Sequence, residues 1–313
     1  MKYKEKPLVA IRCLVYNHEM YLRDCLDGFV MQQTDFSFVA IVHDDASTDA
    51  SAAIIREYEE KYPHIFKPIY EIENQYSKYD GSLERIINEI IDATGAKYVA
   101  MCEGDDYWID PFKLQKQVNI LEADDTLMGV CSDTSIVDNL NHILNPKRGG
   151  VVKDNIEGRY TLHDFFNHNH QYPTASVMYR NAYKEEIRMK YAHTRNAFLG
   201  DWTLWICLHI YGDFYFINEP LVAYRLNPTS ITHSNVNARR LGLAKANFTL
   251  IPAVSSILPD KYKDIKDNLT NNTDWMWFQL AIAYKHQYQY LKMMGCLLLV
   301  FIKKVSNVVL KLK

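Results

Sequence analysis

The sequence lacks the cysteine pairs, the long apolar segments and the basic charge that mark several protein classes. None of its six cysteines forms a C-x-x-C pair, and most lie in apolar stretches, which is typical of buried thiols in a reducing compartment. The apolar run 296–302 is too short to cross a bilayer, and no signal-peptide core precedes the first strand pattern. The net charge of -3 argues against a nucleic-acid binder with a broad basic surface. We therefore expect a cytoplasmic protein that does not bind nucleic acid.

What the chain does contain is an ordinary globular composition. Its 313 residues are 48% hydrophobic and 23% charged, which argues against a disordered chain. This length accommodates one large α/β domain with appendages, or two small domains. No G-x-G-x-x-G follows the first strand pattern, which argues against a nicotinamide or flavin domain.

Strand and helix patterns alternate along the first 123 residues. Apolar, strand-like runs occupy residues 8–16, 38–42, 66–72 and 97–102, with amphipathic helical stripes at 22–30, 54–62, 83–91 and 114–121. This alternation predicts crossover units and an α/β fold with a mainly parallel sheet flanked by helices. Later patterns predict a strand, a turn at 218–220 and a second strand over 214–226, followed by helical segments at 238–258 and 274–304.

Acidic residues follow two of these predicted strands. Asp44 and Asp45 end one run, and Glu103, Asp105 and Asp106 end another. The carboxyl ends of parallel strands form the edge where open α/β folds bind ligands, so the two segments are expected to converge on one crevice. Burying an unpaired charge costs free energy, so such a cluster is not expected inside a packed core. A hard divalent cation is the ligand that residues 103–106 fit best.

Each candidate also has a simpler interpretation. Asp44 and Asp45 precede a strand-to-helix turn, where they would act as helix caps. The segment 103–106 is also compatible with a solvated acidic turn. Asp201 begins a helical pattern, so it is either an N-cap or a general base for an acceptor hydroxyl. His233 is either a late metal ligand or an ordinary polar loop residue.

Four motifs, in order, resemble those of glycosyltransferase family 2, which has the GT-A fold. They are Val15-Tyr16-Asn17-His18-Glu19, His43-Asp44-Asp45-Ala46-Ser47-Thr48-Asp49, Glu103-Gly104-Asp105-Asp106-Tyr107-Trp108 and Leu199-Gly200-Asp201-Trp202. Residues 110–117 are also similar to the stretch that follows the metal motif in bacterial members. The resemblance covers residues 7 to about 235.

The resemblance implies a metal-dependent, inverting transferase that uses a nucleotide-sugar, with UDP-sugars favoured. Its acceptor would be a hydroxyl of a surface glycan or a lipid-linked oligosaccharide, as in polysaccharide biosynthesis. By position, Asp45 would contact the base and Asp44 would support that loop. In the D-x-D-type site, Asp106 would bind Mn²⁺ or Mg²⁺, and Asp105 would lie near the donor ribose or sugar. Asp201 would be the catalytic base.

Some positions depart from the family pattern. Many relatives have a small hydroxyl residue before the Tyr-Asn of the first motif, where this chain has Val15. Ala46 replaces the usual glycine of the D-D-G-S turn. Lys78 and Arg85 are basic residues that would meet the diphosphate, and Arg85 is the one that we retain as a donor-binding candidate. His233 is retained beside Asp106 as a metal ligand.

These patterns divide the chain into a transferase domain, residues 1–235, and a helical segment, residues 236–313. The donor half of the domain spans about 7–135 and the acceptor half about 136–235. On a helix, Lys303 and Lys304 share one face of the tail, opposite an apolar face. Such a basic amphipathic helix predicts peripheral attachment to the inner face of the plasma membrane. Packing on the catalytic domain, or on a second copy in a homodimer, is the alternative.

Two other functions are compatible with an α/β fold of this kind. A sugar-phosphate nucleotidyltransferase would carry a glycine-rich, basic phosphate loop after the first strand, where this chain has Asn17-His18-Glu19. A non-catalytic sugar-binding protein on the same fold would not need Asp106 and Asp201. We therefore rank both below the transferase.

Overall fold

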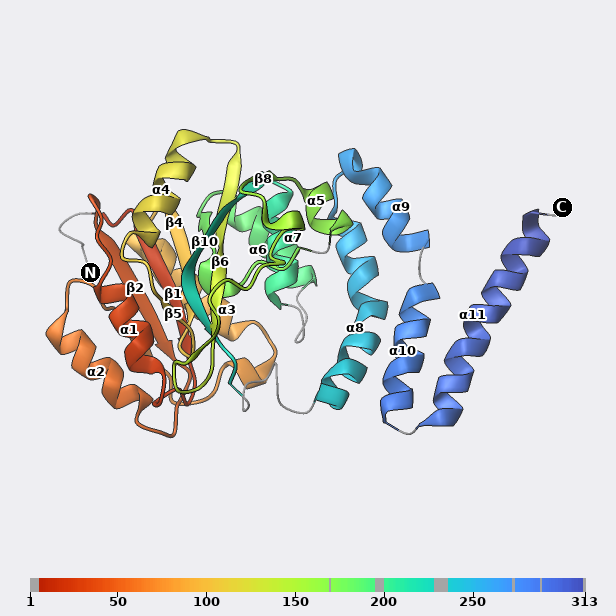
Figure 1. Ribbon diagram of the computed structural model, residues 1–313, viewed down its shortest axis with the longest axis horizontal. Helices are drawn as coiled ribbons and strands as arrows, with labels where there is room; N and C mark the ends of the chain where they lie inside the picture. The colour runs from red at the N-terminus through yellow and green to blue at the C-terminus, as the bar shows by residue number, and fades with distance from the viewer. Residues whose placement is uncertain are drawn as a thin grey trace. The chain divides into compact units, whose positions relative to one another are not determined.

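The computed structural model describes residues 6–168, 170–194, 200–227, 236–271, 274–287 and 289–311. The chain forms two compact units, residues 1–187 with 211–227 and residues 188–210 with 228–313. The first unit is α/β, and the elements described in the second are helical (Figure 1). The boundary at residue 235 stays a prediction.

The amino-terminal half of the sheet is parallel, as the sequence predicts. Its strands are β1 (Val9–Val15), β2 (Phe38–Asp44), β3 (Ile69–Tyr70) and β4 (Tyr98–Glu103), in the order β3-β2-β1-β4. In the parallel register of β1, Val15 pairs with Asp44 on β2 and Leu14 pairs with Glu103 on β4. The carboxyl ends of β2 and β4 therefore flank the end of β1.

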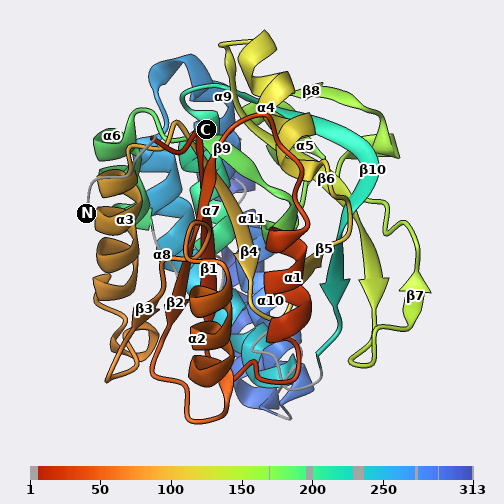
Figure 2. The same ribbon diagram turned by 90° about the vertical axis from the view of Figure 1, so that its left-hand side faces the viewer.

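Helices cover both faces of this parallel half. They are α1 (Leu22–Val30), α2 (Ser51–Lys61), α3 (Ser82–Thr94) and α4 (Lys113–Ala123). The core on one face joins Val9, Ile11 and Cys13 to α1, α2 and α4, whereas Ala10 faces a separate core with Ile87 of α3. Figure 2 shows α3 and α1 on opposite sides of β1 and β2.

The remainder of the sheet is mixed. It is built from β5 (Tyr107–Trp108), β6 (Leu127–Val137), β7 (Ile143–Asn145), β8 (Gly158–Tyr160), β9 (Met178–Arg180) and β10 (Asp213–Arg225). The order continues from β4 as β9-β6-β10-β5, with β9 antiparallel to β4 and β6, and β10 parallel to β6. The fold class is therefore confirmed as α/β with a sheet that turns mixed in its second half.

β10 is continuous through Asn218, Glu219 and Pro220, so the prediction of a turn between two strands there is wrong. Pairing with β6 instead shifts register on either side of Pro220. Proline has no N–H to give to the ladder, and a bulge absorbs it without ending the strand. The long strand carries its last residue, Arg225, toward the β4–β5 turn, where β5 pairs Trp108 with Val222.

The remaining elements are helical. The α-helices are α5 (Leu162–Asn167), α6 (Lys184–Thr194), α7 (Gly200–His209), α8 (Val236–Ile257), α9 (Lys263–Asn271), α10 (Asp274–His286) and α11 (Tyr290–Lys311). Short 3-10 helices are η1 (Tyr76–Lys78), η2 (Lys153–Asn155), η3 (Thr174–Ser176) and η4 (Asp260–Tyr262). The predicted segment 274–304 is thus two helices, α10 and α11, which pack with α8 around Ala244, Leu280 and Cys296.

All six cysteines are buried, in agreement with their apolar surroundings in the sequence. Three of them lie in contact, with Cys25 Sγ 3.9 Å from both Cys13 Sγ and Cys102 Sγ. Over the described part of the chain, no helix is both long enough and apolar enough to cross a membrane.

Candidate functional site

Two acidic segments lie at one edge of the parallel sheet, on either side of the end of β1. Asp44 ends β2 and Glu103 ends β4, and both pair with the last residues of β1. Two strand spacings separate such positions by about 10 Å. The convergence that the sequence predicts is therefore present.

The loop after β1 and the loop after β2 are joined by hydrogen bonds. The Asn17 N–H donates to Ser47 Oγ at 2.9 Å, and the Thr48 N–H donates to Asn17 Oδ1 at 2.8 Å. The His18 N–H donates to Ser51 Oγ at 2.9 Å. The first two family-like motifs thus form one connected surface at the edge of the sheet.

Ala46 takes a left-handed backbone conformation in this surface, with φ of 61°. A side chain with a Cβ is strained there, whereas glycine is not. The departure from the family's glycine therefore keeps the turn but leaves it under strain.

Hydrogen-bond partners distinguish Asp45 from Asp44. Asp45 Oδ1 accepts the Gln75 N–H at 2.6 Å and Oδ2 accepts the Tyr76 N–H at 3.0 Å, so its carboxylate holds the start of η1. Asp44 is 2% exposed, and its Oδ1 has no hydrogen-bond partner among the described residues. Burial raises the pKa of Asp44, and hydrogen bonds from Ser47 oppose this rise. Within the described part of the chain, Asp44 thus has a buried acceptor atom without a donor.

A buried polar chain supports the loop that Asp45 holds. His43 Nε2 lies 3.3 Å from Glu71 Oε1, and Gln75 Nε2 donates to Glu71 Oε2 at 3.2 Å. Burial lowers the pKa of His43, although Asp45 and Glu71 act in the opposite direction. The chain connects the end of β2 to the η1 loop.

The acidic turn after β4 contains a buried carboxylate beside a second one. Asp106 is 5% exposed, and its Oδ1 accepts the Arg225 N–H at 2.9 Å. Burial raises the pKa of Asp106 well above its usual range, and the nearby Asp105 carboxylate raises it further. A cation beside the pair would relieve both costs, because it favours the charged form of each acid.

The turn is also sterically constrained. A Cβ on Gly104 would lie 2.6 Å from His18 Nδ1, so glycine is required by this close approach. Burial lowers the pKa of His18, whereas the carboxylates of Asp105 and Asp49 raise it. The ring of His18 therefore packs directly against the acidic turn.

The side chains of the acidic turn supply only part of the ligand set that a hard cation needs. Carboxylate oxygens are the ligands that Mg²⁺ and Mn²⁺ prefer, and Asp105 and Asp106 supply them. Over the residues that the structure describes, no three His, Cys, Asp or Glu side chains are grouped so as to hold a metal ion. The predicted ligand His233 lies outside the described residues. One or two carboxylates with phosphate oxygens and water are the usual set for Mg²⁺ at a nucleotide, and the turn is compatible with that set.

Arg225 is a residue of this site that the sequence does not reveal. Its backbone binds Asp106, and its Nε donates to the Asp105 carbonyl oxygen at 2.8 Å. Nothing in the local pattern around residue 225 points to this role, because the two acids are about 120 positions away in the sequence. A motif that paired this arginine with the acidic turn would have been needed to find it.

Two further predicted residues belong to other elements. Asp201 is exposed in the first turn of α7, in the second unit, and its Oδ1 accepts the Trp202 N–H at 2.8 Å. Arg85 is on α3, its side chain is 65% exposed, and its Nη1 lies 3.4 Å from Glu89 Oε1. The catalytic role of Asp201 and the diphosphate role of Arg85 stay predictions.

Comparison with known proteins gives the chain relatives over much of its length. The family described as Glycosyl transferase family 2 matches residues 13–187. An uncharacterized protein of Mycobacterium bovis is 43% identical over 114 residues, which are 36% of this chain and 31% of that protein. An uncharacterized glycosyltransferase of Rickettsia prowazekii is 26% identical over 236 residues, covering 74% of this chain and 68% of that protein. The chain thus spans about a third of the mycobacterial relative's length.

Solved structures agree on the fold. The S. aureus TarS 1-349 complex with UDP has a TM-score of 0.53 at 13% identity, covering 96% of this chain and 91% of that chain. A mannosyltransferase of Pyrobaculum calidifontis, in complex with GDP-Man and Mn²⁺, has a TM-score of 0.53 at 16% identity, covering 99% and 82%. The fold is therefore that of the GT-A glycosyltransferases. Because the family match extends over more than half of the sequence, the chain belongs to glycosyl transferase family 2.

Proposed function

We propose that this protein is an inverting, metal-dependent glycosyltransferase that uses a nucleotide-sugar, with UDP-sugars favoured. Its acceptor is a hydroxyl of a surface glycan or a lipid-linked oligosaccharide. The observation that carries the proposal is the pairing of Asp44 and Glu103 with the end of β1, which sets a buried acceptor atom and an acidic turn at one edge of the sheet. Family membership supports the same reaction class.

The donor base binds at the end of β2. Asp44 Oδ1 is buried and has no donor among the described residues, so a base N–H directed at it would satisfy both groups. Both carboxylate oxygens of Asp45 accept hydrogen bonds from the backbone N–H groups of Gln75 and Tyr76, which suits a residue that holds the loop in shape. This assigns base contact to Asp44 and loop support to Asp45, the reverse of the roles that the family pattern alone implies.

The acidic turn binds the cation and the diphosphate. Asp106 and Asp105 would hold Mn²⁺ or Mg²⁺, with Asp106 as the direct ligand. A cation held there would stabilise the negative charge that develops on a departing nucleoside diphosphate. Asp106 itself is held in place by the Arg225 N–H, so little reorganisation is needed when the cation arrives.

Asp201 acts as the catalytic base. Its carboxylate takes the proton of the acceptor hydroxyl while the acceptor oxygen bonds to the anomeric carbon and the bond from that carbon to the diphosphate oxygen breaks. One displacement inverts the configuration at the anomeric carbon. The exposed position of Asp201 in the first turn of α7 leaves it accessible to an acceptor.

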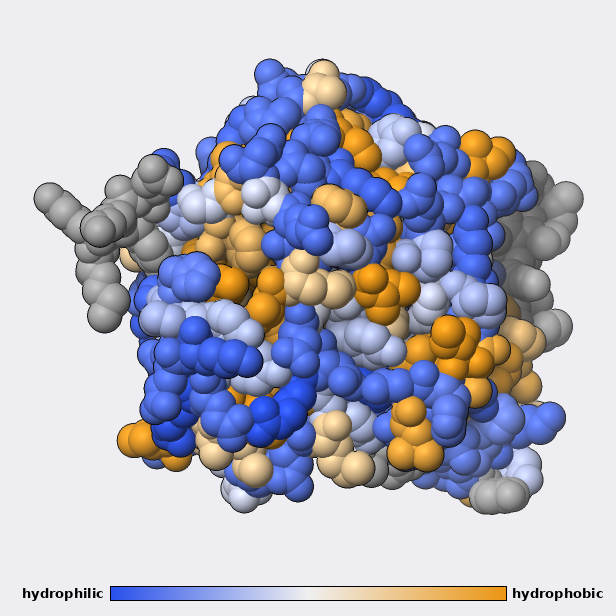
Figure 3. Space-filling view, turned by 60° about the vertical axis from the view of Figure 1, so that its left-hand side comes forward, coloured by the Kyte–Doolittle hydropathy of each residue, from blue (hydrophilic) through white to orange (hydrophobic). Residues whose placement is uncertain are grey.

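The carboxyl-terminal helix α11 binds an anionic membrane surface. On the face drawn in Figure 3, hydrophobic residues are interspersed among hydrophilic ones. The first half of α11 exposes three apolar side chains along one side of the helix: Leu291 is 91% exposed, Met294 58% and Leu298 57%. The sequence 290–311 holds four lysines and no acidic residue, which suits anionic headgroups.

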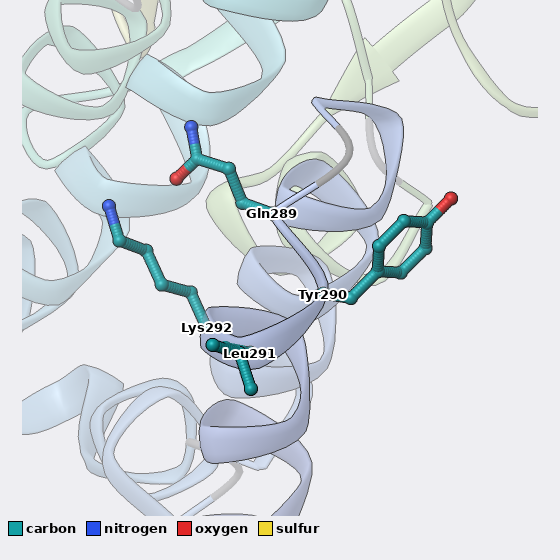
Figure 4. A pocket seen from close by; sticks show the side chains of 4 residues that line it. All are labelled: Gln289, Tyr290, Leu291 and Lys292. Carbon is teal, nitrogen blue, oxygen red and sulfur yellow. The ribbon is translucent and has the colours of Figure 1, made fainter.

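The start of α11 shows how these side chains are arranged. Gln289 and Lys292 point to one side of a surface hollow, and Tyr290 points away from them (Figure 4). Lys292 Nζ lies 5.5 Å from the ring of Tyr284, so this lysine is packed against α10. The side chains of Lys303 and Lys304, which form the predicted basic face, are not among those that the structure describes.

A binding experiment tests the donor site. We expect UDP to bind in the presence of Mn²⁺ by isothermal titration calorimetry, and to bind much more weakly after EDTA treatment. Asp44→Asn should reduce UDP affinity by about 10-fold or more, because a hydrogen bond to a charged group is worth about 1.5–3 kcal/mol. Asp80→Asn, at an exposed loop acid of the same unit, is the matched control. Wild-type protein that binds no nucleoside diphosphate, with or without Mn²⁺, would contradict the proposal.

A further inference from the structure

Arg225 connects segments of the first unit that are far apart in the sequence. Its Nη2 lies 2.9 Å from Asp24 Oδ2 on α1, and its Nε donates to the Asp105 carbonyl oxygen at 2.8 Å. Its Nη1 donates to Asn141 Oδ1 at 2.6 Å and to the Asp138 carbonyl oxygen at 3.3 Å, in the turn between β6 and β7. One guanidinium thus holds α1, the acidic turn and the β6–β7 turn together.

Aromatic rings enclose the same guanidinium. Its central carbon lies 4.6 Å from the ring centroid of Tyr21 and 5.3 Å from that of Tyr107. The side chain is 1% exposed. Rings near a buried guanidinium favour its charge and restrict its orientation.

The donors of Arg225 are largely occupied by the protein. A guanidinium has five N–H groups, and four protein oxygens accept from this one: those of Asp24, Asp105, Asp138 and Asn141. A side chain that is this buried and this fully engaged is not arranged to bind a phosphate. Its contacts are suited to fixing protein atoms.

Arg225 fixes atoms of Asp105 and Asp106, the two acids of the turn. The Arg225 N–H binds the Asp106 carboxylate, while the side chain binds the Asp105 backbone. Both contacts come from one residue, so Arg225 fixes the backbone of Asp105 relative to the carboxylate of Asp106.

We propose that Arg225 is a positioning residue that presets the acidic turn for a divalent cation bound together with a nucleoside diphosphate. This inference rests on the proposed function, because it names a residue that prepares the same site. It acts through Asp105 and Asp106 and touches neither the cation nor the nucleotide. Residues that orient metal ligands in this way typically change metal affinity by about 10- to 100-fold when they are replaced.

The chain offers a matched control in Arg180. Arg180 is also a buried arginine of the first unit: its Nε donates to the Leu127 carbonyl oxygen, and its guanidinium lies 5.6 Å from the ring of Tyr98. Tyr98 begins β4, whereas the acidic turn follows the end of that strand. The two arginines thus contact opposite ends of β4, Arg180 at Tyr98 and Arg225 at the turn after Glu103.

The test measures Mn²⁺ affinity in the presence of UDP by electron paramagnetic resonance, together with the thermal unfolding midpoint of each variant. We expect Arg225→Met to weaken Mn²⁺ binding by about 10- to 100-fold, and Arg180→Met to leave it within about threefold while lowering the midpoint at least as much. Asp24→Asn keeps Arg225 and removes the charge of one partner, so it should fold and show a smaller loss of Mn²⁺ affinity. Arg225→Lys should recover the midpoint more than the affinity, because an ammonium cannot reproduce the planar set of donors.

Two outcomes would overturn the inference while leaving the proposed function intact. One is wild-type Mn²⁺ affinity in Arg225→Met and Asp24→Asn alike. The other is a loss of affinity in Arg180→Met as large as that in Arg225→Met, since that would show a general effect of destabilisation. If the wild-type protein binds no Mn²⁺ with any nucleoside diphosphate, the proposed function itself fails and the role of Arg225 fails with it.

Discussion

Lys113 lies fully buried at the start of α4. Its Nζ donates to Gln117 Oε1 at 2.8 Å and lies 4.2 Å from the ring of Trp108. Burial lowers the pKa of Lys113 to about 7, and the weaker effects of Cys102 and Asp110 oppose this. A lysine with such a pKa in the folded state makes stability depend on pH in a definite direction.

The unfolded chain binds the Lys113 proton up to about pH 10.4, whereas the folded state releases it near pH 7. The free energy of unfolding should therefore rise as the pH increases from 7 toward 10. We expect Lys113→Met to remove about 2–3 kcal/mol of this rise between pH 7 and 9.5, measured by urea unfolding as the difference from the wild type. Lys116→Met, at a partly exposed position of the same helix, should keep the wild-type dependence. Parallel curves for the wild type and Lys113→Met would show that the folded state keeps this proton.

Ala46 provides a second prediction for a single residue. At φ of 61°, glycine should be preferred, so Ala46→Gly is expected to raise the free energy of unfolding by about 0.5–1 kcal/mol. Ala53→Gly, on the exposed side of α2, should instead lower it by about 1 kcal/mol, because glycine disfavours a helix interior. Equal losses in both variants, measured by chemical unfolding, would contradict the strain at residue 46.

Among secondary-structure elements, those with a long and regular apolar pattern were predicted well. β1, β2 and β4 are buried runs bounded by polar turns, and α1 and α3 have clear apolar stripes, so local sequence was sufficient. The prediction of a turn at Pro220 was wrong because a proline indicates that the hydrogen-bond ladder is interrupted but not how the chain continues. Whether the strand ends or bulges depends on β6, which lies beside it in the fold.

Helix α11 carries a prediction at this scale. If its exposed apolar side meets a membrane, the protein should co-sediment with vesicles that contain anionic lipid and much less with neutral vesicles. Replacing Leu291 and Leu298 by Ser should reduce this binding by about 10-fold or more, because each buried leucine contributes about 1.5–3 kcal/mol. Met189→Ser, at an exposed apolar position of α6, is the control. Equal binding to both kinds of vesicle, or to neither, would contradict the proposed electrostatic attachment.

At the scale of the whole molecule, a prediction concerns the proposed base. Asp201 belongs to the second compact unit. We expect Asp201→Asn to reduce kcat by about 10²–10⁴-fold, the usual contribution of a general base, with UDP affinity unchanged. Asp264→Asn, in the first turn of α9 in the same unit, should retain activity. Wild-type kcat in Asp201→Asn, measured as nucleotide release from a sugar donor, would exclude Asp201 as the base.

The sequence by itself determined the alternation of strands and helices and the position of acids at the ends of β2 and β4. These features are local, because periodicity and strand ends are set by neighbouring residues. Only the tertiary structure decided which groups each acid contacts. Asp45 is engaged by Gln75 and Tyr76, and Asp106 by Arg225, across separations that no local pattern records. Hydrogen bonds depend on distance and direction in space, so partners remote in sequence are identified only once the chain has folded.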